Sequence, residues 1–169
     1  YYSRKMLGKS SPVTEEEALK KLAALCARTE YCTGDLDEKM RRWGLDEEAR
    51  MRNIDYLVNH QYVDNMRYCQ AFVNDKIKYN KWGRRKIEQA LWAKHISEDI
   101  AKTVLDHIDS SIYMDILKPL LKAKWPTIHA KNDYERSMKL IQFAMGRGFE
   151  TELIRRCIDQ NMIAGTDES

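Results

Sequence analysis

The residues best able to do chemistry lie in the stretch KYNKWGRRKIEQALWAKHI, residues 78–96. An aromatic residue and a glycine precede three consecutive basic residues, and an amphipathic run follows. Residues 76–94 hold seven Lys or Arg and one Glu, a net charge of +6 in a chain whose net charge is +3. Such a basic strip suits contact with phosphates or with an acidic protein groove. The alternative interpretation is a solvated helix face that needs no partner.

Arg84 and Arg85 are predicted at the entry to a helix whose buried side carries Ile87 and Leu91. Both are therefore expected to project into solvent. Positive side chains at a helix N-terminus oppose its dipole, which costs a few tenths of a kcal/mol and becomes favourable when an anion binds. Trp82 can stack on a base or fill a partner's pocket, or it can cover the end of its own helix bundle.

Other reactive residue types form no recognisable site. The sequence has no Ser-His-Asp set, HExxH motif or glycine-rich phosphate loop, and its four histidines are scattered. The four cysteines lack CxxC spacing, so we interpret them as reduced thiols that mostly serve as small core residues. We expect no catalytic residue, no metal and no cofactor.

The hydropathy pattern gives no sign of secretion or membrane insertion. No uncharged apolar run approaches the roughly 20 residues that a membrane-spanning helix needs, and the first residues lack the apolar core of a signal peptide. We expect a cytoplasmic protein that does not associate with membranes.

Composition and periodicity predict an all-α fold. Three prolines and seven glycines in 169 residues leave few helix breakers. Apolar residues recur with helical spacing in 15–28, 64–77 and 113–124, whereas strand-like alternation is nowhere sustained. Pro119 fits poorly inside the third of these segments, so that helix is expected to begin near Leu117 or to be kinked.

Comparison of the chain with itself reveals an internal repeat. Segments 34–57, 85–108 and 138–158 superpose without gaps. Five small or apolar positions coincide: Leu36, Ile87 and Leu140; Met40, Leu91 and Ala144; Leu45, Ile96 and Phe149; Ala49, Ile100 and Leu153; Ile54, Leu105 and Ile158. We predict three tandem three-helix modules in an elongated arrangement: 14–61, 62–111 and 112–164, with an N-terminal arm (1–13) and a C-terminal tail (165–169).

Each repeat is predicted to contain a tight turn between two helices. Gly44, His95 and Gly148 occupy the position where the chain leaves a helix in a left-handed conformation. The next helices are predicted to start near 46, 97 and 150. Asp46 and Ser97 are good N-caps, whereas Glu150 is poorer and Thr151 can take its place.

An aromatic residue precedes the second helix of each repeat. These residues are Tyr31, Trp82 and Tyr134. We expect their rings to cover the ends of their own bundles. Trp92 lies outside the shared core register, so it is expected either in solvent or between modules.

Residues 63–97 resemble the middle repeat of the bacterial RecX regulatory proteins. That repeat has an acidic start, an aromatic residue and a basic Gly-Arg-Arg-Ile stretch leading to Leu and Lys-Gly-Ile. The matching residues are Asp64, Tyr68, Phe72, Gly83, Arg84, Arg85, Ile87, Leu91, Lys94 and Ile96. The sequence departs from the pattern at Asn65, Cys69 and His95. The resemblance extends from about Ala18 over nearly the whole chain, but its specific part is the middle third.

The resemblance implies a negative modulator of RecA that is not an enzyme. Such a protein would lodge along the groove of the RecA filament, suppress ATP hydrolysis and strand exchange, and bind single-stranded DNA weakly and non-specifically. We expect a monomer. The expected RecA or DNA contacts are Lys78, Lys81, Trp82, Arg84, Arg85, Lys86 and Lys94, with Lys118, Lys122, Lys124 and Arg147 as secondary contacts. A helical scaffold and a DNA-binding module without RecA inhibition stay open as alternatives.

Overall fold

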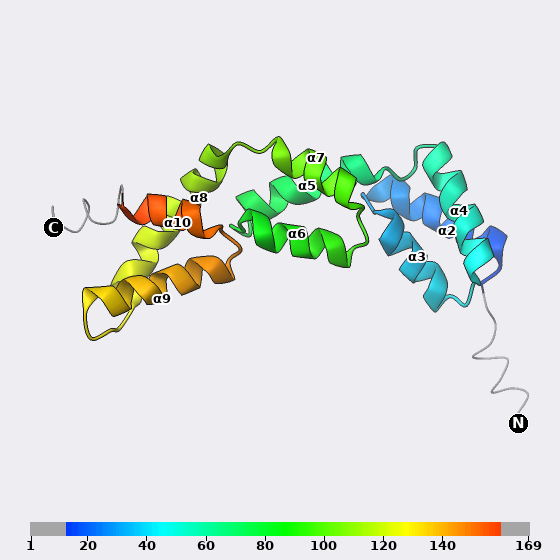
Figure 1. Cartoon of the computed structure of the whole chain (residues 1–169). Helices are drawn as coiled ribbons and strands as arrows, with labels where there is room; N and C mark the ends of the chain where they lie inside the picture. The colour runs from blue at the N-terminus through cyan, green and yellow to red at the C-terminus, as the bar shows by residue number, and fades with distance from the viewer. Residues whose placement is uncertain (1–12, 160–169) are drawn as a thin grey trace, which may run out of the picture. The chain divides into compact units, whose positions relative to one another are not determined.

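The computed structural model describes residues 13–159, and all regular structure in that range is helical. The all-α prediction is confirmed. The predicted tail, the end of the third predicted module and nearly all of the predicted arm lie outside the described residues. The elements in Figure 1 are α2 (Glu15–Arg28), α3 (Thr33–Arg42), α4 (Glu47–Asn59), α5 (Asn65–Lys78), α6 (Arg84–Ala93), α7 (Glu98–Asp106), α8 (Ser110–Lys124), a 3-10 turn (Trp125–Thr127), α9 (Asp133–Gly146) and α10 (Thr151–Cys157).

The helices belong to two compact units. The first ends at Cys69 and also includes Lys94–Ile96, and the second holds Gln70–Ala93 with the residues from Ser97 onward. The boundary falls inside α5. The extents predicted for this helix and for α2 agree with the structure to within one residue.

In the first unit, α2 and α3 pack against α4. The core residues Leu22, Leu36 and Met40 are fully buried. Asn53 is a polar residue inside this core, and its Nδ2 donates to the Glu15 carbonyl oxygen over 3.1 Å. This bond offsets the cost of burying the amide.

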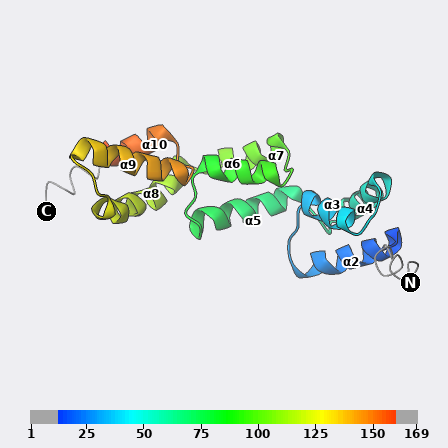
Figure 2. The same ribbon diagram turned by 90° about the horizontal axis from the view of Figure 1, so that it is seen from below.

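In the second unit, α6 packs against α7, while α8, α9 and α10 pack against one another. Both views show α5 running beside α6 (Figures 1 and 2). The side chains that fill the interior are apolar: Val73, Ile77, Ile87, Leu91, Leu105, Leu117, Leu121, Leu140, Ala144, Phe149 and Ile154.

The predicted repeat register is confirmed at its first three positions. All nine side chains there are buried. The fifth position is less uniform: Leu105 is fully buried, but Ile54 and Ile158 are only partly buried. The backbone is left-handed at all three predicted turn positions, with φ of 88° at Gly44, 62° at His95 and 93° at Gly148.

The third helices begin where their predicted caps place them. Asp46 accepts a hydrogen bond from the Ala49 amide over 2.9 Å, and Ser97 accepts one from the Ile100 amide over 3.3 Å. Glu150 occupies the N-cap position of α10 without a side-chain hydrogen bond, and Thr151 is already the first helical residue. Thr151 therefore does not replace Glu150 as the cap.

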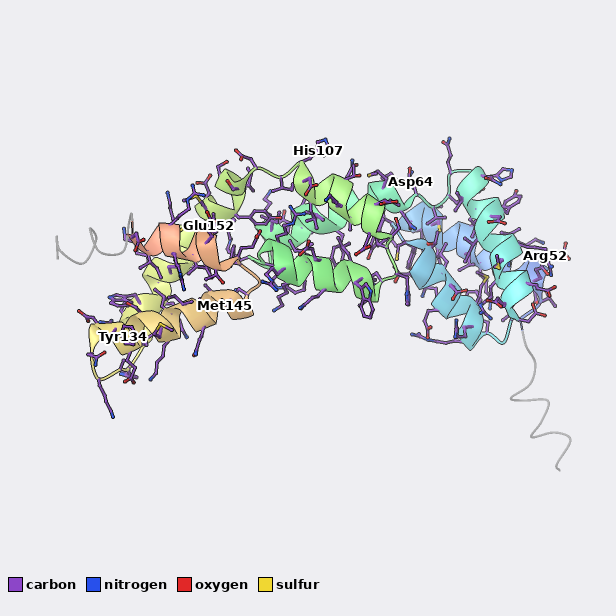
Figure 3. All side chains as sticks on the ribbon, in the orientation of Figure 1. Arg52, Asp64, His107, Tyr134, Met145 and Glu152 are labelled. Carbon is purple, nitrogen blue, oxygen red and sulfur yellow. The ribbon has the colours of Figure 1, made fainter. Side chains whose placement is uncertain are left out.

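Two local expectations are not met. Pro119 lies inside α8, which begins at Ser110, so the first of the two alternatives, a helix that starts near Leu117, is wrong, and a kink stays a prediction. Tyr134 does not cover a bundle end, since 75% of it is exposed at the beginning of α9 (Figure 3). α9 starts at Asp133, which places Tyr134 in the first helical turn rather than ahead of the helix.

A backbone joint links α6 to the turn before α10 within the second unit. The Gly83 amide donates to the Arg147 carbonyl over 2.8 Å, and the Arg85 amide donates to the Gly148 carbonyl over 2.9 Å. A Cβ on Gly83 would collide with the backbone of Gly148 and Phe149. Glycine at this position therefore permits the close approach.

The corresponding contact recurs within the first unit. Gly34, in the first turn of α3, faces the Lys94 carbonyl so closely that a Cβ would overlap the oxygen. The Cys32 thiol lies 3.7 Å from the same oxygen. In both places the start of a second helix meets the turn of the following repeat. We call these two contacts the repeat joints.

We expect Gly148→Ala to lower the free energy of unfolding by at least about 2 kcal/mol. Alanine disfavours a φ of 93°, and its Cβ would overlap Lys86. The matched control is Gly146→Ala, since a Cβ there meets nothing within 4 Å. Helix propensity should keep the control within about 1 kcal/mol of the wild type, on the stabilising side. Urea denaturation followed by circular dichroism measures both, and equal stabilities would contradict this account of the joint.

Candidate functional site

Two lysines lie over the indole ring of Trp82. The Nζ atoms of Lys76 and Lys86 are 5.0 and 4.8 Å from the centre of the ring. Lys76 also lies 5.1 Å from the ring centre of Phe72. Within residues 13–159, neither lysine forms an ion pair. We call Lys76, Trp82 and Lys86 the Trp82 cation cluster.

Local backbone geometry positions this cluster. Lys76 lies in the last turn of α5, and its carbonyl accepts a hydrogen bond from the Trp82 amide over 3.1 Å. Lys81 adopts a left-handed φ of 58°, which reverses the chain between α5 and α6. Because α6 begins at Arg84, Lys86 lies in its first turn. Two cations from different helices thus approach the same ring.

A pocket of about 310 Å³ adjoins the cluster in the second unit. Arg85, Lys86 and Gln89 of α6 line it on one side. Its other lining residues come from α9, from the joint and from the start of α10: Met145, Gly146, Gly148, Phe149 and Thr151. Arg85 is exposed and forms no ion pair among the described residues. This surface can therefore offer Arg85 and Lys86 to an anionic group.

Arg84 differs from its prediction. Its side chain is only 26% exposed, and its guanidinium pairs with Asp106 at 2.7 Å and with Glu88 at 3.3 Å. The hydrogen bond from Arg84 lowers the pKa of the Asp106 carboxyl. Arg84 therefore ties α6 to the end of α7, and the expectation that it projects freely into solvent is wrong.

Lys94 also has an internal partner. Its Nζ lies 3.0 Å from Asp35 in the first unit. Hydrogen bonding to that carboxylate raises the pKa of Lys94. Lys94 is therefore a structural residue of the first repeat joint, although 40% of its side chain stays exposed.

The remaining predicted contacts of the middle repeat are exposed. Lys78 lies 5.3 Å from the ring centre of Tyr79, and the Lys81 ammonium donates to the Lys78 carbonyl over 3.2 Å. Trp92 is 77% exposed, so of its two predicted locations, in solvent or between modules, the one in solvent is correct.

The predicted secondary contacts are only partly brought together. Lys124 and Arg147 both lie over Phe143, at 4.9 and 5.2 Å from the centre of its ring. Lys118 and Lys122 also lie on α8, where Lys122 is exposed and Lys118 half-buried. Phe143 thus organises two of the four cations much as Trp82 organises Lys76 and Lys86.

Two amides at the N-terminus of α6 already have backbone partners. The amides of Gly83 and Arg85 already donate to the carbonyls of Arg147 and Gly148. These two amides are therefore not available to an anion, and the expectation based on the helix dipole stays a prediction.

Nothing in residues 13–159 suggests a metal centre or reactive thiol. No three His, Cys, Asp or Glu side chains are placed to share a metal ion there. Each of the four cysteines is free, and burial raises the pKa of the Cys32 thiol to about 11. In the same range, no helix combines the length and apolar character required to span a membrane.

The comparisons with known proteins agree with this architecture. Residues 64–105 match the family model for the second three-helix domain of RecX, and residues 112–158 match that for its third three-helix domain. Together the two matches cover more than half of the chain. The chain belongs to the RecX family.

Several curated RecX relatives are 24–29% identical to this chain over the aligned residues. The regulatory protein RecX of Clostridium perfringens strain 13 is 29% identical over 82% of this chain and 66% of its own length. That of Clostridium botulinum strain Alaska E43 is 28% identical over 74% of this chain and 59% of its own length. The chain thus spans less than two thirds of both relatives. That of Chlorobium phaeobacteroides is matched over 87% of its own length at 28% identity.

Solved structures support the fold. A crystal structure of regulatory protein RecX aligns with a TM-score of 0.80 at 18% identity, covering 86% of this chain and 72% of that one. The structure of RecX from Lactobacillus salivarius also gives 0.80, at 15% identity, covering 88% and 97%.

Sequence reasoning missed two residues of this candidate site. Lys76 belongs to the basic strip but not to the expected RecA or DNA contacts, and the sequence pattern gives no indication of Gln89. The spacing of Phe72 and Lys76 four residues apart on one helix would have signalled Lys76. Gln89 lines its pocket only because α9 approaches α6, which no local pattern encodes.

We expect Arg84→Gln to raise the pKa of Asp106 toward its ordinary value, near 4. The folded-state pKa of Asp106 is lowered, so the stability from this pair is present above the unfolded-state pKa and is lost as pH falls through the folded-state value. NMR titration of the Asp106 carboxyl measures the change. Arg85→Gln is the matched control, because Arg85 does not pair with Asp106. An unchanged pKa in Arg84→Gln would show that the pair does not form in solution.

Proposed function

We propose that this RecX-family chain is a non-enzymatic negative regulator of RecA that binds the RecA–DNA filament. It inhibits the ATPase, strand exchange and growth or persistence of the filament. The observation that carries the proposal is the Trp82 cation cluster, whose lysines have no carboxylate partner among the described residues. The names of the relatives support the regulatory role.

Electrostatics explains why these cations suit a filament groove. Holding Lys76 and Lys86 on one ring brings like charges together, and an incoming anion relieves their repulsion. Each exposed ion pair contributes only about 0.2–1 kcal/mol, so affinity requires several contacts at once. A filament groove lined by phosphates and carboxylates supplies such contacts along its length. Arg85, Lys78 and Lys81 extend the contact surface beyond the cluster.

Inhibition follows from bridging. A helical body that contacts neighbouring RecA subunits restrains the relative motion that hydrolysis and strand exchange require. The chain needs no chemistry of its own for this effect, because binding that favours one filament state shifts the population toward that state. Arg84 and Lys94 contribute indirectly in this proposal, by holding α6 and the turn that follows it.

A DNA-binding module without RecA inhibition is the second candidate. The geometry that favours it is an indole close to two ammonium groups, because aromatic and cationic side chains together suit contact with the bases and phosphates of a single strand. Binding to single-stranded DNA without RecA, measured across a salt series, separates the two candidates. Tight binding with a steep salt dependence, together with no inhibition of RecA at saturating DNA, would favour the DNA-binding module.

We expect the double variant Arg85→Glu, Lys86→Glu to weaken inhibition of the DNA-dependent RecA ATPase by at least about tenfold in the concentration needed for half inhibition. Arg84 is left unchanged because its replacement would also break the pairs with Glu88 and Asp106. The matched control, Lys102→Glu with Lys131→Glu, makes the same charge change at two exposed positions away from the cluster. Circular dichroism verifies that both variants stay helical. Equal inhibition by the Arg85–Lys86 variant and the wild type would exclude this surface as the binding site.

A further inference from the structure

The first unit carries an apolar pocket that has no role in the proposed function. Its volume is about 320 Å³. Ala24 and Leu25 of α2 form its floor together with Trp43, the C-cap of α3, and Lys21 and Arg28 stand at its edge. The four α2 residues, Lys21, Ala24, Leu25 and Arg28, lie at positions i, i+3, i+4 and i+7, so they share one face of the helix. A pocket of this size accepts one or two large apolar side chains.

The charges around the pocket are unbalanced. Lys21 and Arg28 are exposed, and the described residues provide neither with an ion pair. The Lys21 ammonium lies instead 5.3 Å from the ring centre of Trp43. The rim is therefore cationic while the floor is apolar.

The acidic residues that could neutralise this rim already have other partners. Glu17, one turn before Lys21, accepts from the Thr14 amide in a capping box, and its pKa is lowered chiefly by hydrogen bonding to Thr14 and less by the charge of Lys21. Glu30, near Arg28 in sequence, pairs with Arg67 at 2.5 Å. Glu38 of α3 pairs with Arg42 at 3.5 Å. Lys21 and Arg28 are thus left available to an external carboxylate.

The repeat gives an independent reason to expect a partner at this end of the first unit. Trp43 occupies the register position of Lys94 and Arg147, whose carbonyls receive the preceding repeat in the two repeat joints. Among the described residues, no helix start meets the Trp43 carbonyl in this way. Within residues 13–159 the turn of the first repeat is therefore uncovered, and it carries an indole where the other two repeats carry a cation.

We propose that this pocket binds an acidic protein segment anchored by a large apolar side chain. The anchor packs on Trp43, Ala24 and Leu25, while flanking carboxylates pair with Lys21 and Arg28. Charge complementarity selects this occupant over a neutral apolar peptide. The site shares no residue with the Trp82 cation cluster, so this proposal can be tested independently of RecA inhibition.

The test uses the full chain and a short fluorescent peptide in which a run of aspartates precedes Leu and Phe. We expect saturable binding by fluorescence anisotropy, weakening with salt, and a change in the NMR signal of the Trp43 indole. Replacing the aspartates with asparagine, or Leu and Phe with alanine, should each weaken binding by at least about tenfold.

Protein variants separate this site from general attraction of anions. Lys21→Glu with Arg28→Glu should weaken peptide binding by at least about tenfold. Lys20→Glu on the same helix is the matched control, since Lys20 is exposed but does not line the pocket, and it should bind nearly as the wild type does. Ala24→Phe, which fills the pocket, should abolish binding without changing the helical signal.

Three outcomes would overturn the proposal. The first is equal binding by the Lys21–Arg28 variant and the wild type, and the second is equal binding of the asparagine peptide. The third is the absence of peptide binding together with self-association that Ala24→Phe abolishes, which would assign the pocket to a second copy of the chain. Because RecA inhibition is measured separately, loss of peptide binding does not bear on the proposed function.

Discussion

The close approach of a helix start to the turn of the next repeat is the constraint on which the second unit depends. Gly83 lets α6 come near enough for its amides to donate to the Arg147 and Gly148 carbonyls. Any side chain at Gly83 would overlap the backbone of Gly148 and Phe149, and any side chain at Gly148 would overlap Lys86. The same contact fixes the direction of Arg85 and Lys86, because both lie in the first turn of the helix that it holds. The backbone contact that holds α6 in the fold therefore also positions the cations of the candidate site.

The joint also explains why adjacent arginines have different roles. Arg84 lies on the side of α6 that faces the end of α7, where Asp106 and Glu88 neutralise it. Arg85 lies on the side that borders the pocket with Met145 and Thr151, and no carboxylate among the described residues pairs with it. One residue of rotation along a helix thus separates a structural cation from one available to a partner. A count of charges in the sequence cannot distinguish Arg84 from Arg85. The packing of α7 against α6 distinguishes them, because it places Asp106 beside Arg84 only.

Sequence predicted the repeated, local part of this structure well. The buried register, the three left-handed turns and the caps Asp46 and Ser97 each depend on residues within a few positions of one another. The pairs that neutralise Arg84 and Lys94 could not be predicted in this way, since Asp106 is 22 residues from Arg84 and Asp35 is 59 residues from Lys94. Those pairings depend on how repeats pack. The prediction that Tyr134 covers a bundle end is wrong for a local reason, because its helix begins earlier than the repeat pattern indicates.

The third repeat shows what changes when the position corresponding to Gly83 carries a large side chain. That position is occupied by Arg136, whose guanidinium donates two hydrogen bonds to the Trp125 carbonyl at 3.0 and 2.7 Å and lies 4.2 Å from the centre of the Trp125 ring. A side chain of this size prevents the close approach that Gly83 permits. Arg136 therefore closes its own bundle instead of receiving another turn. The repeats thus carry a small residue, Cys32 or Gly83, at the two joints and an arginine bound within its own bundle at the same register position of the third repeat.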